Sequence, residues 1–213
     1  MPSAKSLDAV TIDAAGTLVE LVDPTERLRS LLAEQGVVRG PDEVRSAFAL
    51  EVAYYVPRSD TGRDRESLAV LQHDAVGIFL DSLGADVDAA LFASAFLSAL
   101  EFRAVVGAAD ALHRLRSAGL ELACVANWDV TLESYLEQAG LRFYFAAVVC
   151  SAEAGAAKPD PAIFIRALER LGVSPERALH IGDGEVDREG ARAAGLAFEP
   201  VPLATLPQRL GLG

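Results

Sequence analysis

The hydrophobic and polar positions of this chain follow two different rhythms. From about residue 106 onward, short apolar runs alternate with stretches of helical spacing, most of which stop at a glycine. The expected strands are 120–126, 146–150, 178–181 and 197–201, and the expected helices are 107–118, 130–139, 160–171 and 187–194. Together with an apolar strand at 8–13, this alternation predicts an α/β protein with a parallel, doubly wound sheet.

The stretch between these parts has helical spacing and no expected strand. Its four expected helices are 24–34, 41–55, 66–83 and 87–100, and a polar segment at 57–65 separates the second from the third. Four consecutive helices after the first strand indicate an inserted helical subdomain. We therefore expect a core formed by residues 1–19 and 102–213, and a helical cap formed by residues 20–101.

Composition and charge narrow the classes of function. Hydrophobic residues make up 51% of the chain and the formal net charge is −12, so we expect a folded protein that repels nucleic acid. A small phosphorylated substrate stays possible, because a metal ion can dominate the local field. Cys124 and Cys150 lie in apolar runs and are expected to be buried thiols. No apolar run reaches the length of a membrane span, and we expect a cytoplasmic protein without a membrane partner.

Polar residues follow four of the expected strands. Asp13 follows the first, Asn127 and Asp129 the second, Lys158 comes after the third, and Asp183 and Asp187 follow the fourth. A single acid before a turn is commonly a capping residue. This is the simpler interpretation of Asp13 when it is considered without the other polar residues. Because the carboxyl ends of parallel strands line one crevice, the combination of several acids and a lysine favours a binding or catalytic site.

These segments resemble the motifs of the haloacid dehalogenase-like hydrolase superfamily. The matching segments are Asp13-Ala14-Ala15-Gly16-Thr17, Lys158-Pro159-Asp160-Pro161 and Gly182-Asp183-Gly184-Glu185-Val186-Asp187. The resemblance covers nearly the whole chain, and the helical insert is similar to the four-helix cap of that family. It implies a Rossmann-like core with an inserted four-helix cap.

The resemblance also implies roles for individual residues. Asp13 would be the nucleophile that forms an aspartyl-phosphate, and Lys158 would neutralise the charge of the nucleophile and the phosphoryl oxygens. Asp13, Asp183, Asp187 and the backbone carbonyl of Ala15 would hold Mg²⁺, which prefers hard oxygen ligands. Two simpler interpretations stand beside these roles: Lys158 as a structural ion-pair partner of Asp13 or Asp183, and Asp187 as a helix cap.

The chain departs from the phosphatase pattern at two positions. Ala15 stands where the family's phosphatases have a second Asp, which moves the proton of the leaving group. Ala126 stands where a Ser or Thr would hold a phosphoryl oxygen, and the following Asn127 is the candidate substitute donor. Since general acid–base groups contribute roughly 10²–10⁴-fold, we expect weak turnover. Trp128 is expected to pack or to cover the crevice.

Three alternatives follow from these departures. The fold could serve as a binding or regulatory module with little turnover. A 2-haloacid dehalogenase also lacks the second Asp, but it works without a metal, which the retained Asp183 and Asp187 disfavour. A phosphonoacetaldehyde hydrolase needs a cap lysine, and residues 20–101 contain none.

The remaining candidates lie outside these motifs. Arg58 is a candidate substrate-binding residue, because it lies with Tyr54, Tyr55, Arg63 and Arg65 in the one cap cluster suited to an anionic or aromatic substrate. The simpler interpretation is a solvated loop. His180 is close to the expected site in sequence, but its apolar neighbours indicate strand packing, and no histidine is a good candidate base.

Overall fold

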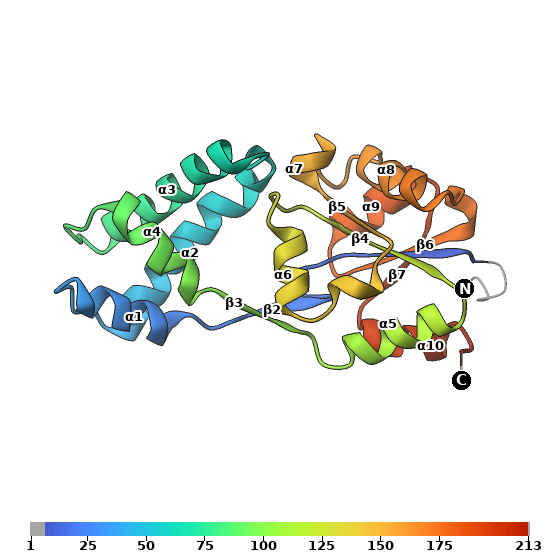
Figure 1. The fold of residues 1–213 in the computed structure, drawn as a ribbon, viewed down its shortest axis with the longest axis horizontal. Coiled ribbons are helices and arrows are strands. Elements are labelled where there is room, and N and C mark those ends of the chain that lie inside the picture. The colour runs from blue at the N-terminus through green and yellow to red at the C-terminus, as the bar shows by residue number, and fades with distance from the viewer. Residues whose placement is uncertain (1–6, 213) are drawn as a thin grey trace. The chain divides into compact units, whose positions relative to one another are not determined.

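Five parallel strands form the main sheet of the computed structural model, which describes residues 7–212 (Figure 1). The order across the sheet is β5–β4–β1–β6–β7. The strands are β1 (Ala9–Ile12), β4 (Glu121–Ala126), β5 (Ala147–Cys150), β6 (Ala178–Gly182) and β7 (Ala197–Pro200). From β1 the chain proceeds to β4 and β5 on one side and then to β6 and β7 on the other. The predicted doubly wound α/β sheet is therefore confirmed, with its topological switch point at β1.

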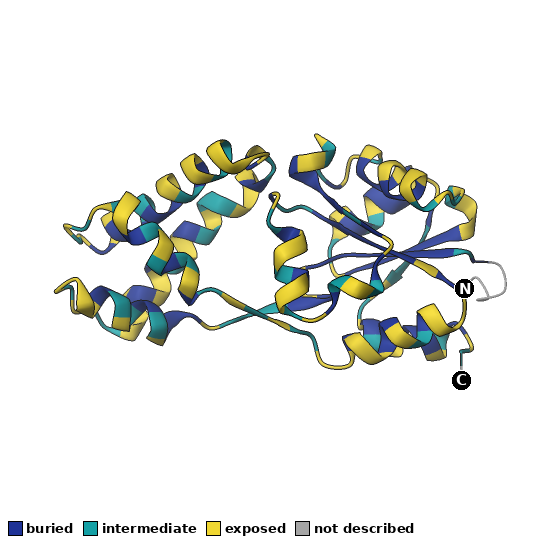
Figure 2. Cartoon of the chain, in the orientation of Figure 1, coloured by how far each residue is buried: buried dark blue, intermediate teal, exposed yellow. Residues whose placement is uncertain are grey.

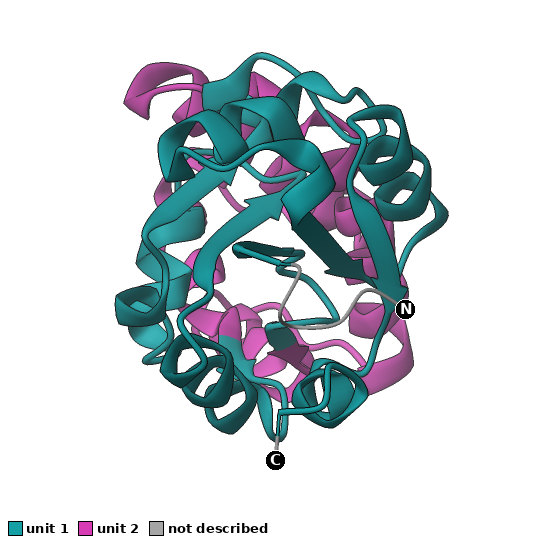
Figure 3. Ribbon diagram, turned by 90° about the vertical axis from the view of Figure 1, so that its right-hand side faces the viewer, with its two compact units in different colours: residues 1–20, 102–213 teal, residues 21–101 magenta. Residues whose placement is uncertain are grey.

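The chain divides into two compact units, which Figure 3 shows in different colours. Residues 1–20 and 102–213 form the unit that contains the parallel sheet, here called the core unit. Residues 21–101 form the second, here called the helical unit.

Strand alternation distributes the core-unit residues between two hydrophobic clusters, one on each face of the sheet. On one face, Val10 and Ile12 of β1 pack with residues of α5 (Ala108–Ser117), α6 (Leu132–Gln138) and α10 (Leu206–Arg209). On the other, Ala9 packs with residues of α8 (Ala162–Leu171) and α9 (Glu185–Ala193). The strands are mostly buried (Figure 2), as expected for a parallel sheet covered on both faces. Thr11 and Asp13 therefore belong to the α8–α9 face.

The helical unit contains four α-helices. They are α1 (Thr25–Glu34), α2 (Pro41–Tyr55), α3 (Arg65–Ser82) and α4 (Ala89–Ala99). The rings of Phe79 and Phe96 meet edge to face at 5.0 Å in its core. The side chains of Asp64 and Asp88 each accept two backbone N–H bonds at the start of α3 and α4, which satisfies donors left free at a helix start. That this unit acts as a cap stays a prediction.

The structure adds short elements that the sequence pattern did not indicate. β2 (Val19–Val22) pairs with β3 (Glu101–Ala104), where the pattern predicted no strand. Most residues of β2 and β3 are half-buried or exposed, so these strands lack the apolar runs that predicted the strands of the main sheet. The polar segment 57–65 overlaps a 3₁₀ helix, η2 (Val56–Thr61). The other short helices are η3 (Arg142–Tyr144), α7 (Ser151–Ala154), η4 (Pro175–Arg177) and η5 (Leu203–Thr205).

The sequence predicted two buried thiols and a cytoplasmic location, and the structure tests only the first. Cys124 and Cys150 are buried, free thiols, as predicted. Among residues 7–212, no helix combines the length and the apolar character needed to cross a membrane. The cytoplasmic location stays a prediction.

Glu51 is a buried carboxyl on α2 of the helical unit. It lies on the buried face of α2 with Val44 and Ala47, and 5% of its surface is exposed. Within the described part of the chain, no hydrogen-bond or ion-pair partner of this carboxyl is found. Burial raises the pKa of Glu51 from an ordinary 4.5 to about 7.

Replacing Glu51 with Gln is expected to stabilise the protein at alkaline pH. The folded state holds the proton more tightly than the unfolded chain, so wild type loses stability as the pH rises from about 4.5 through 7. Glu51→Gln removes this loss, and its unfolding free energy should exceed that of wild type by about 3 kcal/mol at pH 8 and by little at pH 4. Denaturant titrations followed by far-ultraviolet circular dichroism measure this difference. Glu34→Gln, at an exposed position of α1, is the matched control, and an equal advantage at both pH values would contradict the prediction.

Candidate active site

The ammonium group of Lys158 is the centre of the site. Its Nζ donates to Asp13 Oδ1 at 2.5 Å, to Asp187 Oδ1 at 2.6 Å and to the carbonyl oxygen of Val125 at 3.1 Å. The three partners use all three N–H donors of the lysine. Its side chain is only 3% exposed, and a buried charge is tolerated only when it is paired and hydrogen-bonded in this way.

The buried charges shift one another's pKa values. Burial raises the pKa of Asp13 to about 6, although the charge of Lys158 opposes this shift. Burial also acts to raise the pKa of Asp187, but hydrogen bonds from His180 and Lys158 and the lysine charge lower it to about 2. For Lys158, burial favours the neutral amine, but the two carboxylates outweigh it and its pKa lies above the ordinary value. The lysine is therefore charged at neutral pH.

Two glycines allow the acidic residues to converge. Gly16 has a φ of +71°, and a Cβ there would lie 2.5 Å from Asp183 Oδ2. A Cβ at Gly182 would lie 2.7 Å from Asp187 Oδ2. Side chains at either position would displace a carboxylate, so the turn after β1 and the end of β6 need glycine.

Asp13, Asp183 and Asp187 form a group that fits a divalent cation. Each offers one carboxylate oxygen, and these atoms lie within 4.8 Å of one another. Such a set of hard oxygen donors suits Mg²⁺. Asp187 is the most occupied of the three, because its Oδ1 accepts from Lys158 and His180 and its Oδ2 accepts from Gly184 N–H at 3.1 Å. The role of the Ala15 carbonyl as a fourth ligand stays a prediction.

The structure shows the simpler roles of Lys158 and Asp187, and their chemical roles stay predictions. Lys158 is paired with Asp13, as one alternative expected, but its second carboxylate is Asp187 and not Asp183. Asp187 also caps the start of α9 through its bond from Gly184 N–H. One carboxylate therefore serves both the helix and the site.

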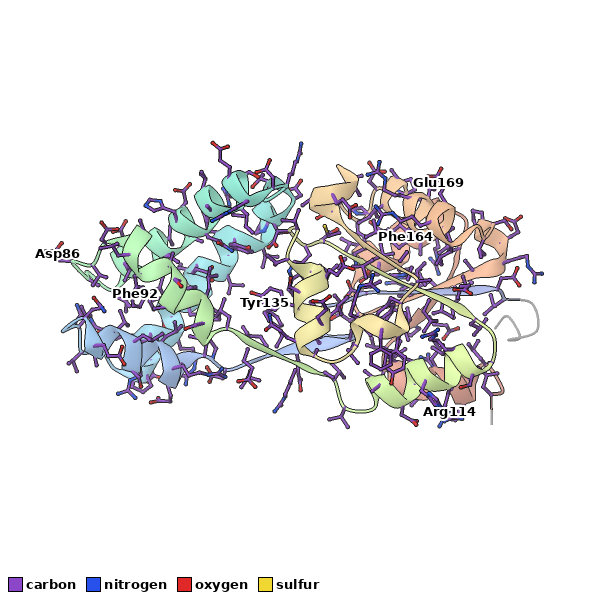
Figure 4. The ribbon with its side chains drawn as sticks, viewed as in Figure 1. Asp86, Phe92, Arg114, Tyr135, Phe164 and Glu169 are labelled. Atoms are coloured by element: carbon purple, nitrogen blue, oxygen red, sulfur yellow. The ribbon has the colours of Figure 1, made fainter. Side chains whose placement is uncertain are left out.

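Asn127 uses its side chain to hold the backbone of Lys158. Its Nδ2 donates to the Lys158 carbonyl at 3.0 Å, and its Oδ1 accepts from the Lys158 N–H at 2.7 Å. Its predicted role as a donor to substrate is untested. The neighbouring Trp128 packs with Phe102 and with Tyr135, labelled in Figure 4, at ring distances of 5.3 and 5.7 Å. Packing is thus a role of Trp128.

Arg58 belongs to the helical unit. It is exposed, stacks 4.2 Å above the ring of Tyr54 and donates to the Tyr54 carbonyl at 3.0 Å. With Thr61 and Asp74 it lines a hollow of about 540 Å³ in that unit. Its predicted contact with a substrate stays a prediction.

His180 is a member of the site that the sequence reasoning missed. It was expected only to pack in its strand, and its ring does meet Phe164 of α8 edge to face at 4.8 Å. Its Nε2 also lies 3.0 Å from Asp187 Oδ1. The available signal was a polar residue inside an otherwise apolar strand, on the same face as Gly182. Burial lowers the pKa of His180, which favours the neutral ring.

The chain is similar to a known family and to several known proteins. A family model described as haloacid dehalogenase-like hydrolase matches residues 7–195. The phosphoglycolate phosphatase of Nitrosospira multiformis is 32% identical over 200 residues, which cover 92% of this chain and 83% of that protein. The haloacid dehalogenase-like hydrolase domain-containing protein 3 of Bos taurus is 44% identical over 102 residues. That match spans only 47% of this chain and 41% of the bovine protein.

A solved structure resembles the chain over nearly its full length. The crystal structure of a HAD phosphatase from Thermococcus onnurineus superimposes with a TM-score of 0.63 at 25% sequence identity. It covers 97% of this chain and 99% of that one.

The acidic group predicts that Mg²⁺ stabilises the protein in a pH-dependent way. A ligand that binds only the folded state adds about 2.7 kcal/mol at a hundred times its Kd. Because the pKa of Asp13 is about 6 without metal, protons compete with the metal, and the Mg²⁺-induced rise in Tm should be larger at about pH 7.5 than at about pH 5. Asp183→Asn should abolish most of the rise, whereas Glu185→Gln, an exposed neighbour, should retain it. An unchanged rise in Asp183→Asn would rule out this site.

Proposed function

The chain belongs to the haloacid dehalogenase-like hydrolase family, and we propose that it is a Mg²⁺-dependent phosphatase that acts on a small phosphorylated molecule. The observation that carries this proposal is the carboxylate of Asp13, held at the end of β1 by the buried ammonium of Lys158. The relatives named as phosphatases, including a glyceraldehyde 3-phosphate phosphatase of Methanopyrus kandleri that is 40% identical over 87 residues, support a phosphate ester as substrate.

In the proposed first step, an Asp13 oxygen attacks phosphorus. The Asp13 O–P bond forms and the bond between phosphorus and the leaving oxygen breaks, which yields an aspartyl-phosphate and an alkoxide that takes a proton from water. Lys158 holds Asp13 Oδ1 and offsets negative charge at the reacting centre. Asp13, Asp183 and Asp187, with the carbonyl of Ala15, would hold Mg²⁺, which when bound neutralises and orients phosphoryl oxygens.

The second step is proposed to be slow. Water must attack the aspartyl-phosphate and lose a proton, but the methyl group of Ala15 cannot accept it. A missing general base costs roughly 10²–10⁴-fold. The first step should also be slowed, because no acid protonates the leaving group. This loss of rate should be smallest for leaving groups of low pKa, which depart without a proton.

Ala15 and Ala126, which replace the family's usual Asp and Ser or Thr, also support a second candidate function. If hydrolysis of the aspartyl-phosphate is slow enough, the chain would act as a binding or regulatory protein that remains phosphorylated after one turnover. A 2-haloacid dehalogenase is the weaker alternative, because its chemistry does not need the acidic group formed by Asp13, Asp183 and Asp187.

A rapid-quench experiment with p-nitrophenyl phosphate tests the proposal. We expect a Mg²⁺-dependent burst of about one equivalent of p-nitrophenol followed by slow turnover, because formation of the aspartyl-phosphate should outpace its hydrolysis. Asp13→Asn should abolish the burst. Ala15→Asp should speed the slow phase by roughly 10²-fold or more, because it supplies the missing acid–base group.

The other outcomes separate the alternatives. Turnover that survives in Asp13→Asn would refute the aspartyl-phosphate. A burst without any later turnover, or neither burst nor turnover across a panel of phosphate esters, would favour the binding or regulatory candidate. Halide release from a 2-haloacid would favour the dehalogenase.

A further inference from the structure

A continuous line of hydrogen bonds runs beneath the candidate nucleophile. Thr11 Oγ1 lies 2.9 Å from His180 Nδ1, and His180 Nε2 lies 3.0 Å from Asp187 Oδ1. The same Asp187 oxygen accepts from Lys158, which donates in turn to Asp13. Every member is buried, and the exposed fraction of His180 is 0%. The line thus connects the middle of β1 to its catalytic end through β6 and α9.

The chemistry of the partners determines how His180 is protonated. An ionised carboxylate only accepts hydrogen bonds, so Nε2 must carry the proton that faces Asp187. Nδ1 then presents its lone pair, and the Thr11 hydroxyl donates to it. In the opposite tautomer, the lone pair of Nε2 would face a lone pair of Asp187 Oδ1 at 3.0 Å, which is repulsive. The alternative acceptor for Thr11, the Leu179 carbonyl, is 3.5 Å away.

The surrounding packing holds the imidazole in this orientation. Thr11 and His180 are direct partners in the register of β1 and β6. The ring of Phe164 packs edge to face against His180, and Phe198 lies on β7 at a ring distance of 6.3 Å. The missing side chain at Gly182 leaves the room that the Asp187 carboxylate occupies.

We infer that His180 is a positioning residue, which with Thr11 orients the Asp187 carboxylate and through it holds the Lys158 ammonium against Asp13. This role rests on the proposed function, because it describes how the same site is kept in order. It gives His180 no proton transfer to the substrate. Without its Nε2–H, the Asp187 carboxylate would lose one of the two donors to Oδ1 and could rotate away from Lys158.

Two amide substitutions separate this role from simple packing. In His180→Gln, the side-chain nitrogen is four bonds from Cα, as Nε2 is in histidine, so it can still donate to Asp187. In His180→Asn the nitrogen is one bond shorter and reaches only the position of Nδ1, beside Thr11. Changes in partners that orient site residues typically cost 10–100-fold in activity. We expect a loss of roughly this size in the burst rate of His180→Asn, and a rate within about threefold of wild type in His180→Gln.

A second readout does not depend on activity. The chain has two lysines, Lys5 and Lys158, so ¹⁵N-lysine labelling in a Lys5→Arg background leaves one side-chain signal. Burial of the ammonium and its three acceptors should slow proton exchange enough to observe it. We expect the signal to be alike in wild type and His180→Gln, and shifted or broadened in His180→Asn. An unchanged signal in His180→Asn, or equal changes in both variants, would overturn the inference.

Substitutions of Thr11 keep the test decisive if His180→Asn does not fold. Thr11→Val removes the donor to Nδ1 with little change in shape, and Thr11→Ser retains it. The Lys158 signal should change in Thr11→Val and return in Thr11→Ser, and no difference between the two would also overturn the inference. If wild type gives no burst while these differences in signal persist, the proposed function fails and the positioning role stands.

Discussion

The structure of the core unit around its site depends on one constraint, which is that the buried charge of Lys158 must be paired. Transfer of an ammonium group out of water costs several kcal/mol unless partners replace its hydration. Asp13, Asp187 and the Val125 carbonyl supply those partners. They come from the end of β1, the first turn of α9 and the strand β4. Any change that moves one of these elements would therefore unbalance two buried carboxylates as well as the lysine.

This constraint explains why the residues around the site have so little freedom. Asn127 holds the Lys158 backbone through both atoms of its amide, Gly182 makes room for Asp187, and Asp187 at once caps α9 and accepts from Lys158. Asp183, by contrast, is exposed and is free to take a ligand. The site thus combines a rigid, charge-paired interior with one accessible carboxylate at its rim, an arrangement suited to binding a cation and the anion that accompanies it.

The two substitutions in the motifs affect different parts of the chemistry. Ala15 removes a group that moves protons, and nothing in the charge pairing of Lys158 depends on it. Ala126 removes a hydroxyl at the end of β4, and the adjacent Asn127 is occupied with the Lys158 backbone. The groups that hold Asp13 and pair its charge are therefore present, while, under the proposed function, the groups that would transfer protons and donate to a phosphoryl oxygen are fewer. The chemical consequence proposed above is slow hydrolysis of the aspartyl-phosphate, with the phosphoryl transfer least affected for leaving groups of low pKa.

The sequence by itself determined the order of strands and helices, the doubly wound sheet and the acids and lysine that follow the strand ends, because apolar periodicity and glycine stops are local signals. It also suggested an ion pair of Lys158 with either Asp13 or Asp183, without deciding between them. It did not determine that Asp187 is the second carboxylate paired with Lys158, or that His180 contacts Asp187. It also did not determine that β2 pairs with β3 or that Glu51 is buried. Those depend on contacts between residues far apart, such as Thr11 and His180, which are separated by 169 positions. Only the folded chain sets the distances and the burial that decide among such partners.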